Sequence, residues 1–236
     1  MMGLFASILE DFQTVKKNDP AFKSNLELFF NYPGVWALFY YRIANFLYKI
    51  KIPYLPRMMS GLGLFLTSID IHPAATIGRR VFIDHGIGVV IGETAVVEDD
   101  VLIYQQVTLG GVSLDKDTKR HPTIKSGTVI GAGAKILGNI TIGEKARIGA
   151  NSVVVRDVPD NSTAVGIPAR VIEKGFDKNP LSHNKIPDID KEVFGYILKR
   201  IAVLENAIIS KDTSNINSKD NELEDLYQAF LKSMKN

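Results

Sequence analysis

The strongest constraint in this 236-residue sequence is a six-residue period that runs through its middle. Every sixth residue is isoleucine or valine, with a single alanine, in two series separated by a break. The series are Ile71, Ile77, Ile83, Val89, Ala95, Val101 and Val107, then Ile124, Ile130, Ile136, Ile142, Ile148 and Val154. A period of six fits neither an α-helix nor a single long strand. It predicts a hexapeptide solenoid, in which short strands wind into a three-sided parallel β-helix and the aliphatic side chains point to its axis.

The break between the two series predicts an external loop. Val107 and Ile124 are seventeen residues apart, which is eleven more than one hexapeptide. We expect the excess, residues 112–122, to leave the coil. Loops extruded from solenoids lie on one face and commonly carry binding groups. This loop contains Arg120 and His121.

The segments on either side of the repeat have helical patterns. The chain therefore divides into an α-helical N-terminal domain (1–68), the β-helix domain (69–175) and a C-terminal extension (176–236) that is helical and partly mobile. Within the first domain, Asn18-Asp19-Pro20 predicts the start of a helix, with Asp19 as its N-cap and Pro20 in its first turn.

The C-terminal extension contains a heptad pattern. Its apolar residues follow one another at alternating steps of three and four, which are typical of a coiled-coil seam two heptads long. The residues are Phe194, Ile197, Ile201, Leu204 and Ile208. A single amphipathic helix lying on its own subunit fits the same pattern, and the sequence leaves both interpretations open.

Composition excludes several classes of function. The net charge of +2 comes from nearly balanced acids and bases, which gives no support to nucleic-acid binding. The chain has no cysteine, which excludes disulfides, thiolate metal ligands and a cysteine nucleophile. The N-terminus lacks a basic leader, and the apolar runs are too short or too interrupted to span a bilayer. We therefore expect a cytoplasmic protein with no membrane partner.

Ionisable side chains gather in the first part of the repeat. Asp70, His72, Asp84 and His85 all lie between residues 70 and 88. Three hexapeptides make one coil, so residues eighteen apart are expected to stack, which puts Asp70 beneath Gly88 at one corner. Because successive coils are roughly 4.8 Å apart, we expect the Asp70 carboxylate and the His85 imidazole to meet there.

This pairing makes His85 a candidate general base. A carboxylate that accepts from one imidazole nitrogen fixes the tautomer and leaves the other nitrogen basic. The convergence of these groups beside a loop that carries Arg120 and His121 indicates a functional site at one corner. The competing interpretation is a histidine satisfied by a neighbouring turn. For His72 the two interpretations stay open, since it can simply cap the corner before Pro73.

Several motifs together resemble those of the serine O-acetyltransferases, a family of hexapeptide-repeat acyltransferases. They are DIHP (70–73), IDHGIGVVIGET (83–94), VTLGG (107–111), KRHP (119–122) and IGAGAKILGNITIG (130–143). The resemblance runs from about residue 18 to 172 and is to a form with a short N-terminal region. It implies that the β-helix is left-handed.

The resemblance also implies a reaction. An acetyl group would pass from acetyl-CoA to the hydroxyl of L-serine, giving O-acetyl-L-serine in the first step of cysteine biosynthesis. His85 would remove the hydroxyl proton, and Asp70 would orient and support the imidazolium. No metal is expected.

Binding roles are implied in the same way. Asp84 and Asp19 would hold the serine ammonium, Arg120 would clamp its carboxylate, and His121 would assist binding or stabilise the oxyanion. Positions close to CoA in the family are matched here by Gly111, Ala132, Ala150 and Arg147, the last standing where the family has lysine.

The resemblance implies partners as well. CoA would lie along the prism between subunits, so the protein would be a homotrimer or a dimer of trimers, with cysteine as a feedback inhibitor. Longer family members end in an isoleucine that enters cysteine synthase. This chain ends SMKN, so we do not expect a stable complex with that enzyme.

Three alternatives remain at this stage. The acyl acceptor could be another hydroxyl compound such as homoserine. The protein could resemble the zinc-dependent carbonic anhydrases built on hexapeptide prisms, with His72, His85 and His121 as metal ligands. It could also be a non-enzymatic scaffold with a vestigial site.

Overall fold

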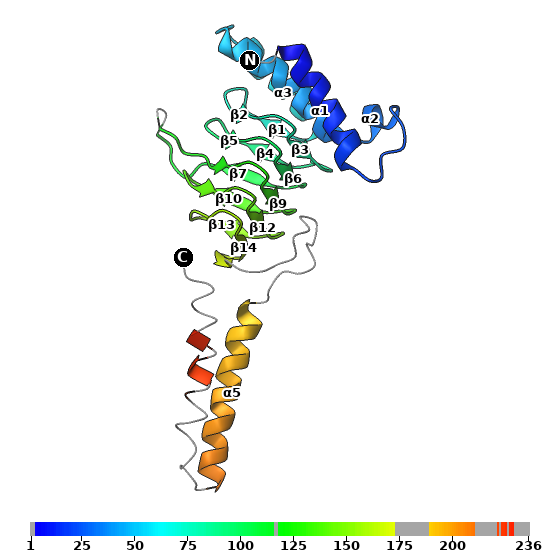
Figure 1. Cartoon of the computed structure of the whole chain (residues 1–236). Coiled ribbons are helices and arrows are strands. Elements are labelled where there is room, and N and C mark those ends of the chain that lie inside the picture. Colours follow the sequence, from blue (N-terminus) through cyan, green and yellow to red (C-terminus); the bar gives the residue numbers. More distant parts are fainter. Residues whose placement is uncertain are drawn as a thin grey trace.

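The computed structural model describes residues 3–115, 118–172 and 189–210, together with residues 221, 223–225, 227 and 228. Four helices come first: α1 (Leu4–Asn18), α2 (Glu27–Phe30), α3 (Pro33–Lys49) and α4 (Leu55–Thr67). They lie at one end of a stack of short strands, and helix α5 (Ile189–Ser210) lies beyond the other end (Figure 1).

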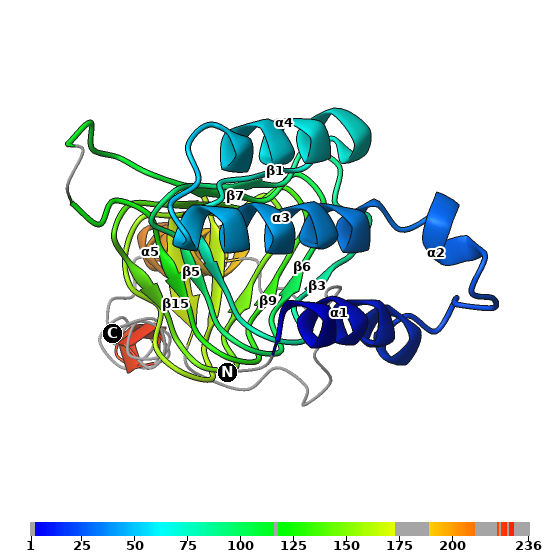
Figure 2. The same cartoon turned by 90° about the horizontal axis from the view of Figure 1, so that it is seen from above.

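The strands form three sheets, which are the three sides of a prism (Figure 2). Sheet A contains β1 (Asp70–Ile71), β4 (Val90–Ile91), β7 (Thr108–Gly110), β10 (Lys135–Leu137) and β13 (Val153–Val154). Sheet B contains β2 (Thr76–Ile77), β5 (Val96–Val97), β8 (Thr123–Ile124) and β11 (Thr141–Ile142). Sheet C contains β3 (Phe82–Ile83), β6 (Leu102–Ile103), β9 (Val129–Ile130), β12 (Arg147–Ile148), β14 (Thr163–Gly166) and β15 (Ala169–Ile172).

Parallel pairing joins each coil of the prism to the next, and one antiparallel pair, β14 with β15, closes sheet C. All thirteen residues of the predicted six-residue series are buried in the core. The predicted solenoid is therefore confirmed, and its axis is filled by the aliphatic side chains that revealed it.

The phase of the repeat differs from the prediction. β3 begins at Phe82 and β4 at Val90, eight residues later instead of six, so two extra residues lie between them. β7 begins at Thr108 and β8 at Thr123, which leaves nine extra residues in the loop between Gly110 and Thr123. The eleven-residue excess assigned to a single loop is therefore split between two corners.

The reason for the error is that each hexapeptide has two inward positions. Val107 and Leu109 are both buried, two residues apart, and the same holds for Ala134 and Ile136. Up to Ile83, counting by six from Ile71 gives the second inward position of each hexapeptide. After the two-residue insertion, the same count gives the first inward position, as at Val107. Burial alone does not distinguish the two positions, so the slip of two residues leaves the apolar pattern intact.

Helix α3 closes the first coil of the prism. The outer edge of this coil has no strand to pair with, and side chains of α3 bind its backbone instead. The Tyr41 hydroxyl donates to the carbonyl of Ala75 (2.7 Å) and accepts from the N–H of Ile77 (3.0 Å). Asn45 donates from Nδ2 to the carbonyl of Ala75 (3.2 Å). An exposed strand edge would invite pairing with another chain, and the helix prevents it.

Arg42 completes this cap and ties it to α1. Its guanidinium donates to the carbonyls of Ile77 (2.7 Å) and Gly78 (2.6 Å) and forms an ion pair with Asp11 (2.9 Å). Burial raises the pKa of the Asp11 carboxyl, and the Arg42 guanidinium opposes that shift. The buried pair fixes the position of α1 relative to the first coil.

A second apolar cluster lies between the helices and the outer face of sheet C. Val15, Leu28, Val35 and Phe82 are its buried members, and Trp36 packs against them. The cluster holds the C-terminal end of α1 against β3. This contact decides where Asp19 lies, because Asp19 follows α1 directly.

The Asn18-Asp19-Pro20 segment ends a helix instead of starting one, so that prediction is wrong. α1 ends at Asn18, and Asp19 adopts extended dihedral angles (φ −95°, ψ 110°). A residue before proline is disfavoured in the helical region, which stops the helix at this point. The Asp19 carboxylate accepts from the backbone N–H of Ala21 (2.7 Å), so it caps a turn of its own.

The predicted C-terminal heptad falls within α5, from Phe194 to Ile208. Its five apolar side chains are exposed in the single chain. The interpretation as a helix lying on its own prism is therefore not what the structure has. The last part of the predicted extension, beyond Ser210, lies largely outside the described residues. No helix in the described part of the chain has the length and hydropathy needed to cross a bilayer.

Replacing Tyr41 with phenylalanine is expected to destabilise the protein. The variant would leave the buried Ile77 N–H without its acceptor and the Ala75 carbonyl with only its longer bond from Asn45, and an unsatisfied buried group costs about 1–3 kcal/mol. Denaturant unfolding measures the change, with Tyr40→Phe as the control on the same helix. Equal stability of the two variants would mean that the cap does not hold the prism end.

Candidate functional site

Two corners of the prism carry the predicted site residues. The C–A corner consists of the segments that join sheet C to sheet A, namely 84–89, 104–107, 131–134 and 149–152. The A–B corner consists of the segments that join sheet A to sheet B, namely 72–75, 92–95, 111–122 and 138–140.

Asp84 and His85 lie at the C–A corner, where the two extra residues enlarge the turn. His85 has a positive φ of 58°, and its side chain is 73% exposed. Its Nε2 lies 4.0 Å from Oδ1 of Asp84. Gly86, which follows, packs so closely on Ile69 that a Cβ atom would lie 2.5 Å from the Ile69 side chain. The turn is therefore pressed onto the coil that contains Asp70.

Asp70 begins β1, immediately after the same corner in the preceding coil. The stacking prediction is wrong by the two inserted residues: Asp70 pairs with Val90, and Gly88 lies beside Ser68, to whose carbonyl it donates (2.8 Å). In the described part of the chain, Asp70 and His85 are not hydrogen-bonded to each other. Their contact stays a prediction.

Asp19 joins the C–A corner from the helical domain. The Tyr32 hydroxyl donates to Oδ2 of Asp19 (2.5 Å), and this bond orients the carboxylate. A cavity of about 530 Å³ opens between the end of α1 and sheet C, and both Asp19 and Asp84 line it. Tyr104 lines the same cavity from the next coil. The cavity therefore places two carboxylates beside the exposed imidazole of His85.

The charges in this cavity influence one another. Burial raises the pKa of the Asp84 carboxyl, the His85 imidazole opposes the shift, and the Asp19 carboxylate adds to it. Burial also raises the pKa of the Tyr32 hydroxyl, as does its hydrogen bond to Asp19. Two neighbouring carboxylates in a partly buried cavity form an anionic pair, which a cation such as a primary ammonium would relieve.

The A–B corner is organised around Thr94. Its Oγ1 accepts from the backbone N–H groups of Arg120 (3.0 Å) and His121 (3.1 Å), which ties the end of the loop to the corner. Arg120 donates from Nη2 to Glu93 (2.6 Å) and from Nη1 to the carbonyl of Asp115 (3.0 Å). The guanidinium is thus held in place before any ligand binds.

The two histidines of this corner have defined protonation states. The backbone N–H of Thr94 donates to Nδ1 of His121 (3.2 Å), and that of Ala74 donates to Nδ1 of His72 (3.1 Å). Burial lowers the pKa of both imidazoles, and the neighbouring Arg120 lowers that of His121 further. Both effects favour the neutral ring, and because Nδ1 accepts a hydrogen bond, the neutral ring carries its hydrogen on Nε2. His72 caps its corner, as one of the two interpretations predicted.

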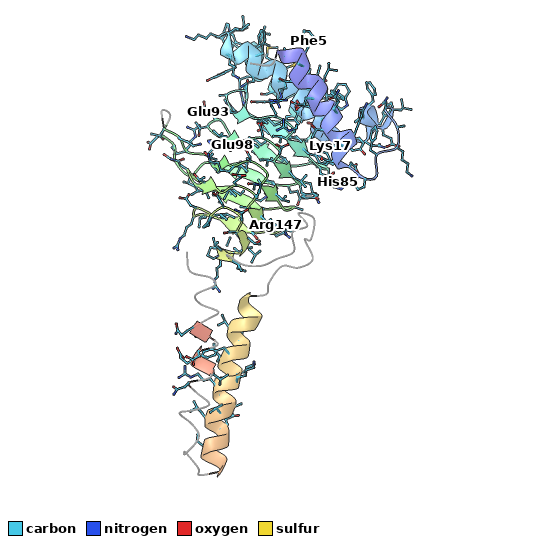
Figure 3. The ribbon with its side chains drawn as sticks, viewed as in Figure 1. Phe5, Lys17, His85, Glu93, Glu98 and Arg147 are labelled. Atoms are coloured by element: carbon cyan, nitrogen blue, oxygen red, sulfur yellow. The ribbon has the colours of Figure 1, made fainter. Side chains whose placement is uncertain are left out.

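The predicted convergence at one corner is wrong for a single chain. Figure 3 labels His85 and Glu93, which lie at opposite sides of the prism. Asp19, Asp84 and His85 belong to the C–A corner, and Arg120 and His121 belong to the A–B corner. About four residue steps of strand separate the two corners, or roughly 13 Å. The site exists in two halves.

The residues predicted to approach CoA are also divided. Ala132 and Ala150 lie at the C–A corner, two and three coils beyond His85, and the Ala132 carbonyl accepts from the N–H of Asn151 (2.8 Å). Gly111 lies at the A–B corner, where a Cβ atom would be 3.1 Å from the side chains of Arg120 and His121. Arg147 is half-buried at the start of β12.

The structure adds Tyr32, Glu93 and Thr94 to the candidate site, because each contacts a predicted site residue. Sequence reasoning missed them because each acts through another side chain. The adjacency of Glu93 and Thr94 to a corner was a usable signal. Tyr32 gave none, because its contact with Asp19 depends on how α1 and α3 pack. Among the described residues, no group of three or more histidines and carboxylates is arranged to bind a metal ion.

The repeat matches a family model described as "Bacterial transferase hexapeptide (six repeats)" over residues 121–156. Curated relatives match much more of the chain. A serine acetyltransferase of Synechococcus elongatus is 50% identical over 206 residues, which are 87% of this chain and 84% of the relative. A serine acetyltransferase of Bacillus subtilis is 48% identical over 203 residues, which are 85% of this chain and 93% of the relative.

Solved structures similar to this chain are also serine acetyltransferases. The soybean serine acetyltransferase complexed with serine is 43% identical, with a TM-score of 0.68 over 72% of this chain and 69% of that one. Serine acetyltransferase structures in complex with cysteine and with CoA give TM-scores of 0.68 and 0.66 at 42% and 41% identity; each covers 72% of this chain, and the shares of those chains are 70% and 69%. Together with the hexapeptide match, they confirm the predicted left-handed β-helix.

Replacing Thr94 with valine is expected to raise the pKa of the His121 imidazole. The hydroxyl lies 2.9 Å from Nδ1, and its loss removes a donor that stabilises the neutral ring. NMR titration of the histidine rings measures the shift, and Thr94→Ser, which keeps the hydroxyl, is the matched control. If valine and serine gave the same titration, Thr94 would not organise this corner.

Proposed function

Because the chain belongs to the serine acetyltransferase family, we propose that its two corners together perform acetyl transfer from acetyl-CoA to serine. The enzyme is an acyltransferase, and serine is its acyl acceptor. The observation that carries the assignment of roles is the exposed His85 imidazole beside the Asp19–Asp84 carboxylate pair. A general base and an ammonium site at one corner are what a reaction at an amino-acid hydroxyl requires.

In the proposed reaction, His85 removes the proton of the serine hydroxyl as the oxygen attacks the thioester carbon. The tetrahedral intermediate collapses by breaking the carbon–sulfur bond. The imidazolium returns its proton to the CoA sulfur, so O-acetylserine and free CoA leave. Asp70, at the start of β1 beside the same corner, supports the imidazolium charge. No covalent acyl-enzyme is needed, since binding both substrates side by side supplies proximity.

The serine-binding roles follow from charge. Asp19 and Asp84 form an anionic pair suited to the serine ammonium. Arg120 is suited to the serine carboxylate. Glu93 and Asp115 accept from two of its five N–H groups, and the other three can donate to a ligand. The neutral His121 carries a hydrogen on Nε2, which suits it to donate to an oxyanion.

We propose that acetyl-CoA lies along the C–A corner. Ala132 and Ala150 present small side chains in the coils that follow His85, so a ligand can approach the backbone there. Three coil steps, roughly 14 Å, separate His85 from Ala150, which matches an extended substrate lying along the prism. Gly111 and Arg147 are proposed contacts from the A–B corner and from sheet C. A solved relative is in complex with CoA.

The separation of the two half-sites supports a trimer as the smallest active assembly. In a ring of three prisms, the C–A corner of one copy can lie against the A–B corner of the next. The His85 half and the Arg120 half then meet between subunits. A dimer of such trimers is equally compatible with this arrangement.

The wider role is proposed from the product and from relatives. O-acetylserine is the substrate of cysteine synthesis, so we place the enzyme at the first step of that pathway, in the cytoplasm. One solved relative is in complex with cysteine, which supports the proposal that cysteine is a feedback inhibitor of this enzyme.

Replacing His85 with alanine is expected to lower the rate of CoA release by about 10²- to 10⁴-fold, the usual contribution of a general base. A thiol-release assay with acetyl-CoA and serine measures it, and homoserine in place of serine tests acceptor choice. His72→Asn is the control, since its amide oxygen can replace Nδ1 as the acceptor for Ala74. Full activity of His85→Ala, or a preference for homoserine, would contradict the proposal.

Serine binding is expected to weaken as the pH falls, and earlier than for an ordinary aspartate. Ammonium binding needs an anionic Asp84, and the raised pKa of that carboxyl means that it protonates at a higher pH. The KM for serine should therefore rise as the pH is lowered through the range in which the Asp84 carboxyl becomes protonated. Asp84→Asn should raise KM at the pH values where Asp84 is ionised and remove this dependence.

The matched control for this prediction is Asp100→Asn. Asp100 lines the same cavity, but its hydrogen bond to Arg80 lowers the pKa of its carboxyl. Its replacement should leave the pH dependence of the serine KM unchanged. A profile that is lost in the Asp100 variant and kept in the Asp84 variant would contradict the assignment of the ammonium site.

A further inference from the structure

Helix α5 has an apolar stripe that the described chain leaves uncovered. Its members are spaced by three and four residues, and each is exposed: Phe194, Ile197, Ile201, Leu204 and Ile208. The two ends of the stripe, Phe194 and Ile208, are 65% and 76% exposed. Leu198 beside it is also 65% exposed and widens the stripe. A continuous apolar stripe of this length on one helix indicates an interaction surface.

Two described residues near the C-terminus, Glu224 and Tyr227, contact a neighbouring face of α5. The rings of Tyr196 and Tyr227 stack at 4.1 Å. The Tyr196 hydroxyl donates to Glu224 (2.7 Å), and Arg200 forms an ion pair with the same carboxylate (3.0 Å). Neither residue contacts the stripe in the described part of the chain, and the stripe side chains are exposed.

We propose that the stripe binds the same stripe of other copies of this chain, as a parallel, in-register coiled coil. Phe194, Ile201 and Ile208 take the a positions, and Ile197 and Leu204 take the d positions. The proposal rests on the proposed threefold assembly of the enzyme, which sets the number of helices at three. Three prisms related by a threefold axis send their α5 helices from the same end, so the helices run parallel.

Charge complementarity favours this arrangement over an antiparallel one. In a parallel coiled coil, a g residue of one helix faces the e residue five positions later on its neighbour. Arg200 occupies a g position and Glu205 the matching e position, so opposite charges meet, and the five N–H groups of the guanidinium allow it to keep its bond to Glu224 as well. Val193 and Leu198 stand in the same relation and form an apolar pair. An antiparallel pair would set g against g and e against e, which places Arg200 opposite Arg200.

The length of α5 explains why the coiled coil depends on the prism. A helix of 22 residues is about 33 Å long and has two heptads of seam, which is little for a free coiled coil. Tethering the helices to one trimer makes their association intramolecular and raises their effective concentration to the millimolar range. The coiled coil therefore reinforces a trimer that the prisms begin.

The absence of cysteine from the sequence makes a direct test possible. In the full chain, Ile201→Cys places a single thiol in the seam, and Lys199→Cys places one at the f position, facing away. Under mild oxidation, the Ile201→Cys protein should form disulfide-linked pairs at least about tenfold faster, because its thiols are held together. Equal rates, or no cross-link at position 201, would overturn the proposal.

The register is tested by charge in the Ile201→Cys background. Adding Glu205→Arg puts a second cation opposite Arg200 and should slow cross-linking roughly two- to fivefold at low salt, with the difference lost at high salt. Glu205→Gln, which only removes the attraction, is the matched control and should slow it less. No difference between the two variants would exclude this parallel register. The native mass and thiol-release activity of the unmodified protein test the trimer and the enzymatic proposal separately.

Discussion

The structure depends on the parallel hydrogen bonding that ties each coil of the prism to the next. The regular step is eighteen residues, as between Val90 and Thr108 or between Thr123 and Thr141. Because the core is filled from two inward positions in every hexapeptide, extra residues cannot be absorbed along a strand. They are expelled at a corner. The coil that contains Asp84 and His85 has two such residues, and the loop that contains His121 has nine. The functional groups therefore lie where the repeat is interrupted, on a frame that the repeat keeps rigid.

The helical domain contributes to the site through the same frame. Helix α3 closes the first coil with Tyr41 and Arg42, and Arg42 holds α1 through the buried carboxylate of Asp11. The end of α1 then places Asp19 at the cavity, where Tyr32 orients it. The helices that bind the backbone groups of the strand edge thus also position Asp19, one of the two carboxylates of the anionic pair. This explains why a hydroxyl far from any motif matters for the chemistry proposed at the corner.

Much of this was predictable from the sequence, and the failures have physical causes. Burial of an aliphatic residue every sixth position is a periodic property, so the prism and its loop follow from the sequence. The phase does not, because either inward position satisfies the same apolar pattern. Asp19 was assigned to a helix start because aspartate and proline favour that position, but the conformational restriction before Pro20 ended α1 instead. The division of the site between two corners does not depend on this phase: residues 84–89 join the third and fourth strands and residues 111–122 join the seventh and eighth, which are different corners of a three-sided prism.

We propose that one active site is built from the C–A corner of one subunit and the A–B corner of the next. Mixing subunits tests it most directly. His85→Ala and Arg120→Ala are each expected to be nearly inactive alone. The first variant lacks a residue of the C–A half of the site, and the second lacks a residue of the A–B half. Co-assembled in equal amounts, they should recover about a quarter of the wild-type activity, because a quarter of the shared sites receive both intact halves. If the mixed assemblies are as inactive as the separate variants, each site lies within a single subunit and the account is wrong.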